Sequence, residues 1–234
     1  DGAAIATWDH GKTHLWDPAT GEGFDMAESS DPSALAVSPD HQLVATGTLG
    51  NLVVYRERMP QRLGLPKQRA AVSALAFDLD GSHLAAAFDT AIYIVDLATH
   101  DYRLLRGHDA QVLALAWLPD GRLASTSNDL SVRIWNLADG SAQILRGHTK
   151  PVIGIDVRGD AALTVASDGT ARLWDIPTEI GRPLLGHDAA PIFAGFGAAG
   201  ELLVLDGDGR LSHYRDDTPP GEAALRVWIA ALTR

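Results

Sequence analysis

Short hydrophobic runs alternate with turn sequences through the middle of the chain. The clearest example contains four runs, at Val112–Trp117, Arg122–Thr126, Ser131–Asn136 and Ser141–Arg146. The sequences LPDG, SNDL and LADG separate them, and Asp, Asn and Gly at such positions favour tight turns between antiparallel strands. This pattern predicts a four-stranded antiparallel meander.

The same pattern recurs with a period of 39 or 40 residues. One ladder of aromatic or apolar positions consists of Trp16, Tyr55, Val95, Trp135, Trp174 and Tyr214. A second ladder begins the runs ALAV, ALAF, ALAW, GIDV and AGFG, in steps of 40, at Ala34, Ala74, Ala114, Gly154 and Ala194. A third ladder, in the turns that follow, consists of Asp40, Asp80, Asp120 and Asp160. Three ladders in phase indicate repeated copies of one structural unit.

A four-stranded sheet cannot bury both of its faces alone, so adjacent copies must pack face to face. Radial packing of such sheets produces a β-propeller. We therefore predict an all-β fold, a β-propeller of four-stranded antiparallel blades with six blades visible, the first one incomplete. Small residues such as Ala114 and Gly154 suit the crowded inner strand near the axis. The predicted propeller spans residues 1–220, and residues 221–234 form a C-terminal tail.

Repeated dipeptides carry a family resemblance. Gly-His occurs three times, at Gly107-His108, Gly147-His148 and Gly186-His187. Each pair is followed, 26 or 27 residues after its His, by a second dipeptide: Trp135-Asn136, Trp174-Asp175 or Tyr214-Arg215. In these features the chain resembles WD-repeat β-propellers, in particular bacterial ones, over nearly its whole length. The resemblance implies a scaffold that binds a protein or peptide through one face.

Four residue types recur at fixed positions in two of the copies: His108, Ser125, Asp129 and Trp135, then His148, Thr164, Asp168 and Trp174. In both, the hydroxyl residue lies ten residues before the Trp and the Asp lies six before it. A buried indole N–H requires an acceptor, and a carboxylate fixes the tautomer of a His. We predict a structural hydrogen-bond network. A hydrolase triad uses the same residue types, but an active site occurs once and this set recurs.

The set is incomplete in the other copies. The sixth has Val204 at the hydroxyl position, the third keeps only Asp89, and the second has Leu49 at the acidic position. We expect these copies to depend on apolar packing, which makes the first half of the chain the less tightly held half.

Two other stretches contain residues that can bind metals. DHGKTH places His10 and His14 near Asp9, but the same sequence fits a hairpin turn with exposed histidines, and no third ligand lies nearby. DGDGRL, at Asp206–Leu211, resembles the start of a calcium loop but lacks its bidentate Glu, and the period predicts a turn here. We predict no metal site and no cofactor.

Composition excludes several classes of protein. Hydrophobic residues make up 46% and charged residues 21% of the chain, as in ordinary globular domains. No apolar run approaches the roughly 18 residues that a membrane helix needs, and the lack of cysteine excludes disulfides and thiolate zinc sites. A net charge of −11 with scattered basic residues argues against nucleic acid. We expect a cytoplasmic protein without a membrane partner, and the excess of Arg over Lys indicates a bacterial genome.

The start of the chain departs from the repeat. Only 15 residues precede Trp16, whereas the inner strand Pro151–Val157 begins 23 residues before its Trp. Blade one therefore lacks its inner strand. Because the sequence opens at Asp1 without Met, we interpret it as a fragment of a longer chain.

The C-terminal tail allows two predictions. After a Pro-Pro-Gly break, Leu225, Trp228, Ile229 and Leu232 follow helical spacing and favour a short amphipathic helix. Alternatively, Ile229–Thr233 forms a strand that pairs beside Ala3–Thr7 and closes a six-bladed ring. We favour the helix, with missing upstream residues that supply the inner strand and a seventh blade.

The leading functional prediction is a non-catalytic protein-protein interaction scaffold. By the resemblance, its partner binds the face formed by loops that enter the inner strands and join the second and third strands. On this sequence that face includes Gln111, Asn128, Lys150, Ser167 and Ala190. The alternative is a sensor or autoinhibitory domain of a larger bacterial effector, with a protease, kinase or nucleotide-driven switch upstream. An enzyme would need a unique constellation of reactive residues, and the sequence contains none.

Overall fold

The structure, a computed structural model, describes residues 5–9, 12–16, 20–26, 32–56, 59–66, 69–184, 189–197 and 200–215. All regular elements in this part of the chain are strands, β1 to β22, which form six antiparallel sheets. We number the sheets as blades one to six in chain order. A membrane-spanning helix is not found among the described residues.

Each blade is a meander in which neighbouring strands follow one another in the chain. Blades one and two contain β1 (Ile5–Asp9), β2 (Lys12–Trp16) and β3 (Gly23–Met26), then β4 (Ala34–Val37), β5 (Leu43–Thr48), β6 (Asn51–Arg56) and β7 (Met59–Arg62). Blades three and four contain β8 (Val72–Phe77), β9 (His83–Phe88), β10 (Ala91–Asp96) and β11 (Tyr102–Arg106), then β12 (Val112–Trp117), β13 (Leu123–Ser127), β14 (Ser131–Trp135) and β15 (Ala142–Arg146). Blades five and six contain β16 (Val152–Arg158), β17 (Ala161–Ala166), β18 (Ala171–Asp175) and β19 (Ile180–Leu184), then β20 (Pro191–Phe196), β21 (Glu201–Asp206) and β22 (Leu211–Arg215).

The predicted meander is confirmed in blade four, where the strand limits differ from the predicted ones by at most one residue. Its tight turns explain the ladder of aspartates. The carboxylates of Asp40, Asp80 and Asp120 each accept the backbone N–H two residues later, at 2.9–3.1 Å. The residue between adopts a left-handed conformation, which Gly121 does at φ 85° and His41 at φ 60°. These turns close the bottom end of blades two to four.

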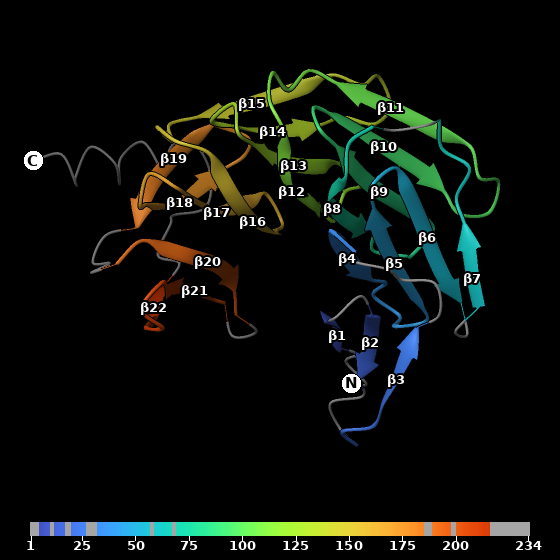
Figure 1. Ribbon diagram of the computed structural model, residues 1–234. Coiled ribbons are helices and arrows are strands. Elements are labelled where there is room, and N and C mark those ends of the chain that lie inside the picture. The colour runs from blue at the N-terminus through green and yellow to red at the C-terminus, as the bar shows by residue number, and fades with distance from the viewer. Residues whose placement is uncertain are drawn as a thin grey trace, which may run out of the picture.

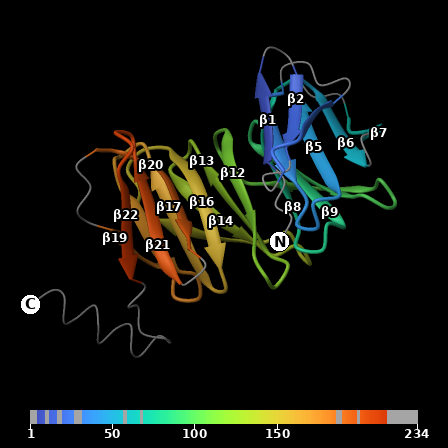
Figure 2. The same cartoon turned by 90° about the horizontal axis from the view of Figure 1, so that it is seen from below.

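The hydrophobic core lies between adjacent blades. Trp135 packs in a cluster with Ile92 and Leu105 of blade three, and Trp174 packs with Ile134 and Leu145 of blade four. Each tryptophan therefore faces the preceding blade. The predicted radial stacking is confirmed, and Figure 2 shows the strands of blades four to six running side by side.

The blades follow one another around an open arc (Figure 1). Among the described residues, contacts join each blade to the next, and the first and last blades do not pair. Blade one contains three strands among the described residues. Its first strand, β1, corresponds to the second strand of blade four, because Thr7 of β1 pairs with His14 in the same way that Ser125 of β13 pairs with Arg133. The described part of blade one therefore has no inner strand. The predicted C-terminal helix and the alternative strand at 229–233 lie outside the described residues.

The second ladder, in the inner strands, needs a correction at its last position. Gly154 pairs with Val165, and Phe193 pairs with Leu205 in the same way. Phe193 is therefore the structural equivalent of Gly154, whereas the spacing of 40 predicted Ala194 at this position. The last inner strand enters one residue earlier than the period predicts, although the strands that follow keep the step of 40. A shift of one residue exchanges the two faces of a strand. The aromatic side chain of Phe193 therefore takes a position where the other blades have Ala or Gly.

Candidate functional site

In blade four the structure brings the four predicted network residues together. The indole Nε1–H of Trp135 donates to Ser125 Oγ at 2.8 Å, and Ser125 Oγ lies 2.7 Å from His108 Nε2. His108 Nδ1 lies 2.7 Å from Asp129 Oδ2. One arrangement satisfies all three bonds: Ser125 donates to Nε2, and Nδ1–H donates to the carboxylate. The chain of bonds links β14, β13 and the loop before β12.

Blade five repeats this geometry with a threonine. Trp174 Nε1 donates to Thr164 Oγ1 at 2.8 Å, Thr164 lies 2.8 Å from His148 Nε2, and His148 Nδ1 lies 3.0 Å from Asp168. The same carboxylate accepts the N–H of Thr149 at 2.8 Å. The loop that enters the inner strand is therefore tied to the turn between the second and third strands.

Glycine precedes His108 and His148 because an arginine and the tryptophan ring lie close by. A Cβ atom on Gly107 would lie 2.7 Å from the Arg133 guanidinium and 3.1 Å from the Trp135 ring, and one on Gly147 would lie 3.0 Å from the Arg172 guanidinium and 3.2 Å from the Trp174 ring. Contacts this short require a neighbour to move. The recurring Gly-His pair thus lets the loop approach the buried indole.

Burial controls the ionisation of these groups. It lowers the pKa of His108 and His148 below the usual histidine value, although the partner carboxylates act in the opposite direction. Burial acts to raise the pKa of Asp129, but hydrogen bonds from Ser131 and His108 outweigh it and bring the pKa to about 2. The networks therefore contain neutral histidines and ionised aspartates at neutral pH.

We expect the midpoint of thermal unfolding to fall as pH is lowered from about 7 to 5. Unfolded histidines bind protons near pH 6.5, whereas the pKa of buried His108 and His148 is lower, so acid favours the unfolded chain in this range. Calorimetry across this range checks it, and a His148→Gln variant should show a smaller decline. A midpoint that stays constant between these pH values would contradict this prediction. The network aspartates, Asp129 and Asp168, lower the stability further only below about pH 4.

The two network hydroxyls are not placed to act as nucleophiles. Ser125 and Thr164 are both 0% exposed, and each hydroxyl already bonds to an indole and an imidazole. A nucleophile must reach its substrate, so this geometry does not support the triad interpretation.

The other blades show what replaces the network. Thr46 and Ala86, both buried, occupy the hydroxyl position of blades two and three, because they pair with Val53 and Tyr93 as Ser125 pairs with Arg133. Ala86 lies in an apolar cluster. Blade one has a hydrogen bond that the fixed spacing missed: Trp16 Nε1 donates to Thr7 Oγ1 at 2.8 Å at an exposed position. Thr7 lies nine residues before Trp16, not ten, since the connection in blade one is one residue shorter.

All five residues predicted for the partner-binding face are exposed at the top end of the blades, opposite the aspartate turns: Gln111, Asn128, Lys150, Ser167 and Ala190. The structure brings Gln111 and Asn128 together, because Asn128 N–H donates to the Gln111 carbonyl at 2.9 Å. In blades five and six the equivalent carbonyls belong to Pro151 and Ala190. Lys150 thus lies one residue before the position equivalent to Gln111.

The top end also carries exposed apolar side chains that the sequence did not single out. Of the ten large hydrophobic residues exposed in the described chain, six lie at top-end positions: Leu49, Leu130, Ile153, Ile192, Phe193 and Leu211. Ile153 and Ile192 occupy the bulge near the start of the inner strands β16 and β20, and Phe193 follows directly. These strands pack beside each other, so the three residues lie on neighbouring strands at the top end, and they are here called the top apolar patch.

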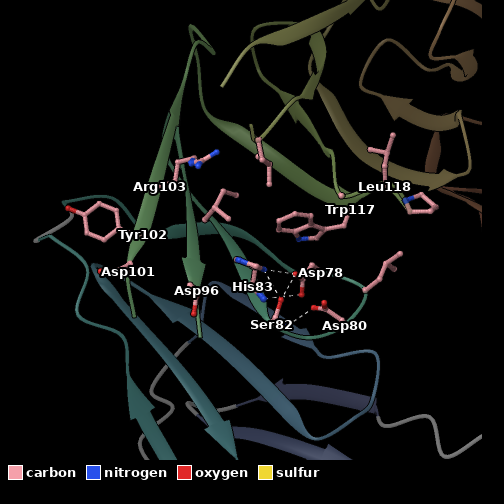
Figure 3. A pocket seen from close by; sticks show the side chains of 15 residues that line it. Asp78, Asp80, Ser82, His83, Asp96, Asp101, Tyr102, Arg103, Trp117 and Leu118 are labelled. Atoms are coloured by element: carbon pink, nitrogen blue, oxygen red, sulfur yellow. Dashed lines mark hydrogen bonds and ion pairs between the residues drawn. The ribbon is translucent and has the colours of Figure 1, made fainter. Parts of the chain in front are cut away.

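A cavity of about 710 Å³ lies at the bottom end between blades three and four (Figure 3). The turn between β8 and β9 contributes Asp78 and Asp80, the start of β9 contributes His83, and the opposite wall comes from the start of β11. Trp117, at the end of β12, is 8% exposed and donates its indole N–H to the Ala76 carbonyl at 3.0 Å. This cavity belongs to the face that sequence reasoning did not choose.

One group of potential metal ligands lies at this cavity. Single ligand atoms of Asp78, Asp80 and His83 lie within 4.8 Å of one another. His83 Nδ1, however, lies 2.8 Å from Asp78 Oδ2, which also accepts from Ser82 at 3.0 Å. At the predicted histidine stretch, His14 pairs with Asp25 at 2.7 Å, while His10 lies outside the described residues. The stretch at Asp206 forms a turn, as predicted.

Comparisons with known proteins agree with this geometry. Residues 100–136 and 140–175, which contain all eight residues of the two networks, match the family described as WD domain, G-beta repeat. The chain is similar in structure to the computationally designed Ika8 protein, with a TM-score of 0.76 and 24% identity over 91% of this chain and 67% of that one. It is also similar to U3-55K, with a TM-score of 0.70 and 25% identity over 79% of this chain and 61% of that one. A search of curated proteins gave no match.

Proposed function

We propose that this chain, which matches WD40 repeats at residues 100–136 and 140–175 and has a propeller-like fold, is a non-catalytic scaffold that binds a protein or peptide at its top end. WD40 repeats commonly serve as protein-interaction scaffolds. The partner-binding surface comprises the top apolar patch and the neighbouring loops with Lys150 and Ser167.

The top apolar patch is the observation that carries this proposal. Ile192 and Phe193 are each 55% exposed, and Ile153 is 38% exposed. Exposed apolar groups that cluster on a protein surface favour interaction, and aromatic side chains contribute strongly to binding energy at interfaces. A partner segment with apolar side chains would cover this patch, and Lys150 adds a positive charge at its edge.

The partner can be a separate protein or another domain of the same polypeptide, such as an effector domain in a bacterial multidomain protein. Both cases use the same surface. Recovery of the parent reading frame distinguishes them, because an adjoining effector domain would favour binding within one chain.

We expect Phe193→Asp to abolish most binding at the top end without lowering the unfolding midpoint. Peptides selected from a random display library against the 234-residue chain provide the ligand, and fluorescence anisotropy gives the Kd. Placing a carboxylate where an apolar anchor binds should weaken affinity by about tenfold or more. Lys150→Glu should cause a smaller loss that diminishes at high salt.

Met59→Asp is the matched control. Met59 is 71% exposed at the start of β7, at the bottom end, so the variant removes an exposed apolar residue and adds the same charge. Equal affinity of wild type and Phe193→Asp for every selected peptide would overturn the proposed surface.

A further inference from the structure

We propose that the bottom cavity between blades three and four is a second binding site, which takes a lysine or arginine side chain from a partner's peptide segment. The site is separate from the top apolar patch because it lies at the opposite end of the blades. Its volume, about 710 Å³, falls in the range of roughly 300 to 1,000 Å³ that is typical of ligand sites, so the cavity can hold a basic side chain with neighbouring atoms of its segment.

The charge of the lining selects a cation. Four carboxylates and one guanidinium line the cavity: Asp78, Asp80, Asp96, Asp101 and Arg103. The whole chain carries a net charge of −11, which adds to the attraction for basic segments and repels acidic ones. Figure 3 shows the carboxylates of Asp78 and Asp80 on one side, with Asp101 and Tyr102 across from them.

Three of these carboxylates accept backbone hydrogen bonds: Asp78 (from the N–H of His83), Asp80 and Asp96. Asp80 Oδ1 accepts the N–H of Ser82 at 2.9 Å, and Asp96 Oδ1 accepts those of Ala98 and Thr99 at 2.8 and 2.9 Å. For Asp80, hydrogen bonds from Ser82 lower the pKa, so the group is ionised at neutral pH. Acceptors that are already fixed lose little conformational entropy when a cation binds.

The rest of the lining suits the alkyl part of such a side chain. Trp117, Leu118 and Ile94 line the cavity with apolar surface, and Trp117 is fixed by its bond to the Ala76 carbonyl. Lysine and arginine place their methylene stems on apolar surface while the charged end reaches polar groups. An indole or phenol face also attracts a cation. Aromatic walls and carboxylates together therefore favour an organic cation.

A bare metal ion fits the same residues less well. Both oxygens of Asp78 accept hydrogen bonds, from the N–H of His83 at 2.9 Å and from its Nδ1 at 2.8 Å. Metal binding would have to replace these bonds, whereas an organic cation can reach the exposed carboxylates of Asp80 and Asp101 and leave them intact.

Nuclear magnetic resonance titration with N-acetyl-arginine amide tests the proposal. The indole N–H resonance of Trp117, assigned with a Trp117→Phe variant, should shift in a saturable manner. N-acetyl-citrulline amide, which has the same shape without the charge, should cause little shift. The double variant Asp80→Asn/Asp101→Asn should weaken binding by about fivefold or more, as expected for the loss of two partly exposed charge pairs.

Asp40→Asn is the matched control, because Asp40 occupies the same turn in blade two, outside the cavity, and accepts the equivalent backbone N–H. It should leave the affinity unchanged, as should Phe193→Asp at the top end, so this test is independent of the proposed function. Equal binding of the citrulline amide, equal weakening by Asp40→Asn, or a response to stoichiometric Zn²⁺ with none to the arginine amide would each overturn the proposal.

Discussion

Replacing His148 with alanine should lower the free energy of unfolding by about 3 to 4 kcal/mol. The substitution removes the imidazole that joins Thr164 to Asp168, at 2.8 and 3.0 Å, and it leaves a buried void, since His148 is only 6% exposed. The loss of both bonds also releases the loop that enters β16. Urea unfolding of the variant and the wild type gives the difference.

His213→Ala is the control for this substitution. His213 lies on β22 and is exposed, so the same chemical change should alter stability by no more than about 0.5 kcal/mol. If His148→Ala and the wild type were equally stable, the network would have no role in stabilising the fold. If His148→Ala does not fold, Thr164→Val, which deletes only the shared hydroxyl, should still show a loss of about 1 to 3 kcal/mol.

Replacing Trp135 with phenylalanine should cost about 2 kcal/mol of stability. The variant keeps an aromatic ring between blades three and four but deletes the donor to Ser125 and part of the packing volume. Trp135 is 2% exposed and belongs to the same cluster as Ile92 and Leu105. Thermal unfolding and urea unfolding should agree on the direction.

Trp16→Phe provides the comparison at the equivalent ladder position. Trp16 makes the same type of bond, to Thr7 Oγ1 at 2.8 Å, but it is 40% exposed. Water can replace an exposed hydrogen bond, so the cost should be about 0.5 kcal/mol or less. A larger loss for Trp16→Phe than for Trp135→Phe would contradict the assignment of stability to buried networks.

The sequence was sufficient for the features that recur. Ser125 and Thr164 stand at one spacing from their tryptophans, so repetition itself indicated that they share a role, and the turn aspartates predicted the strand ends. The same reasoning missed Thr7, because a connection one residue shorter moves the hydroxyl out of phase without changing its place in the sheet.

Features that depend on one blade or on two blades together could not be predicted this way. Phe193 is an exposed apolar residue only because β20 enters its blade one residue early, and the spacing placed Ala194 there. The bottom cavity combines the turn after β8 with the start of β11 and the end of β12, and no single repeat contains that set. Packing between blades creates both features.

We propose that the buried networks maintain the fold while the exposed top end binds the partner. The most direct test is to measure the unfolding midpoint, and the Kd for one selected peptide, in His148→Ala and Phe193→Asp at a temperature where both are folded. We predict that His148→Ala lowers the midpoint and keeps the wild-type Kd, and that Phe193→Asp keeps the midpoint and raises the Kd by about tenfold or more. The reverse pattern, with binding lost in His148→Ala and retained in Phe193→Asp, would contradict the account.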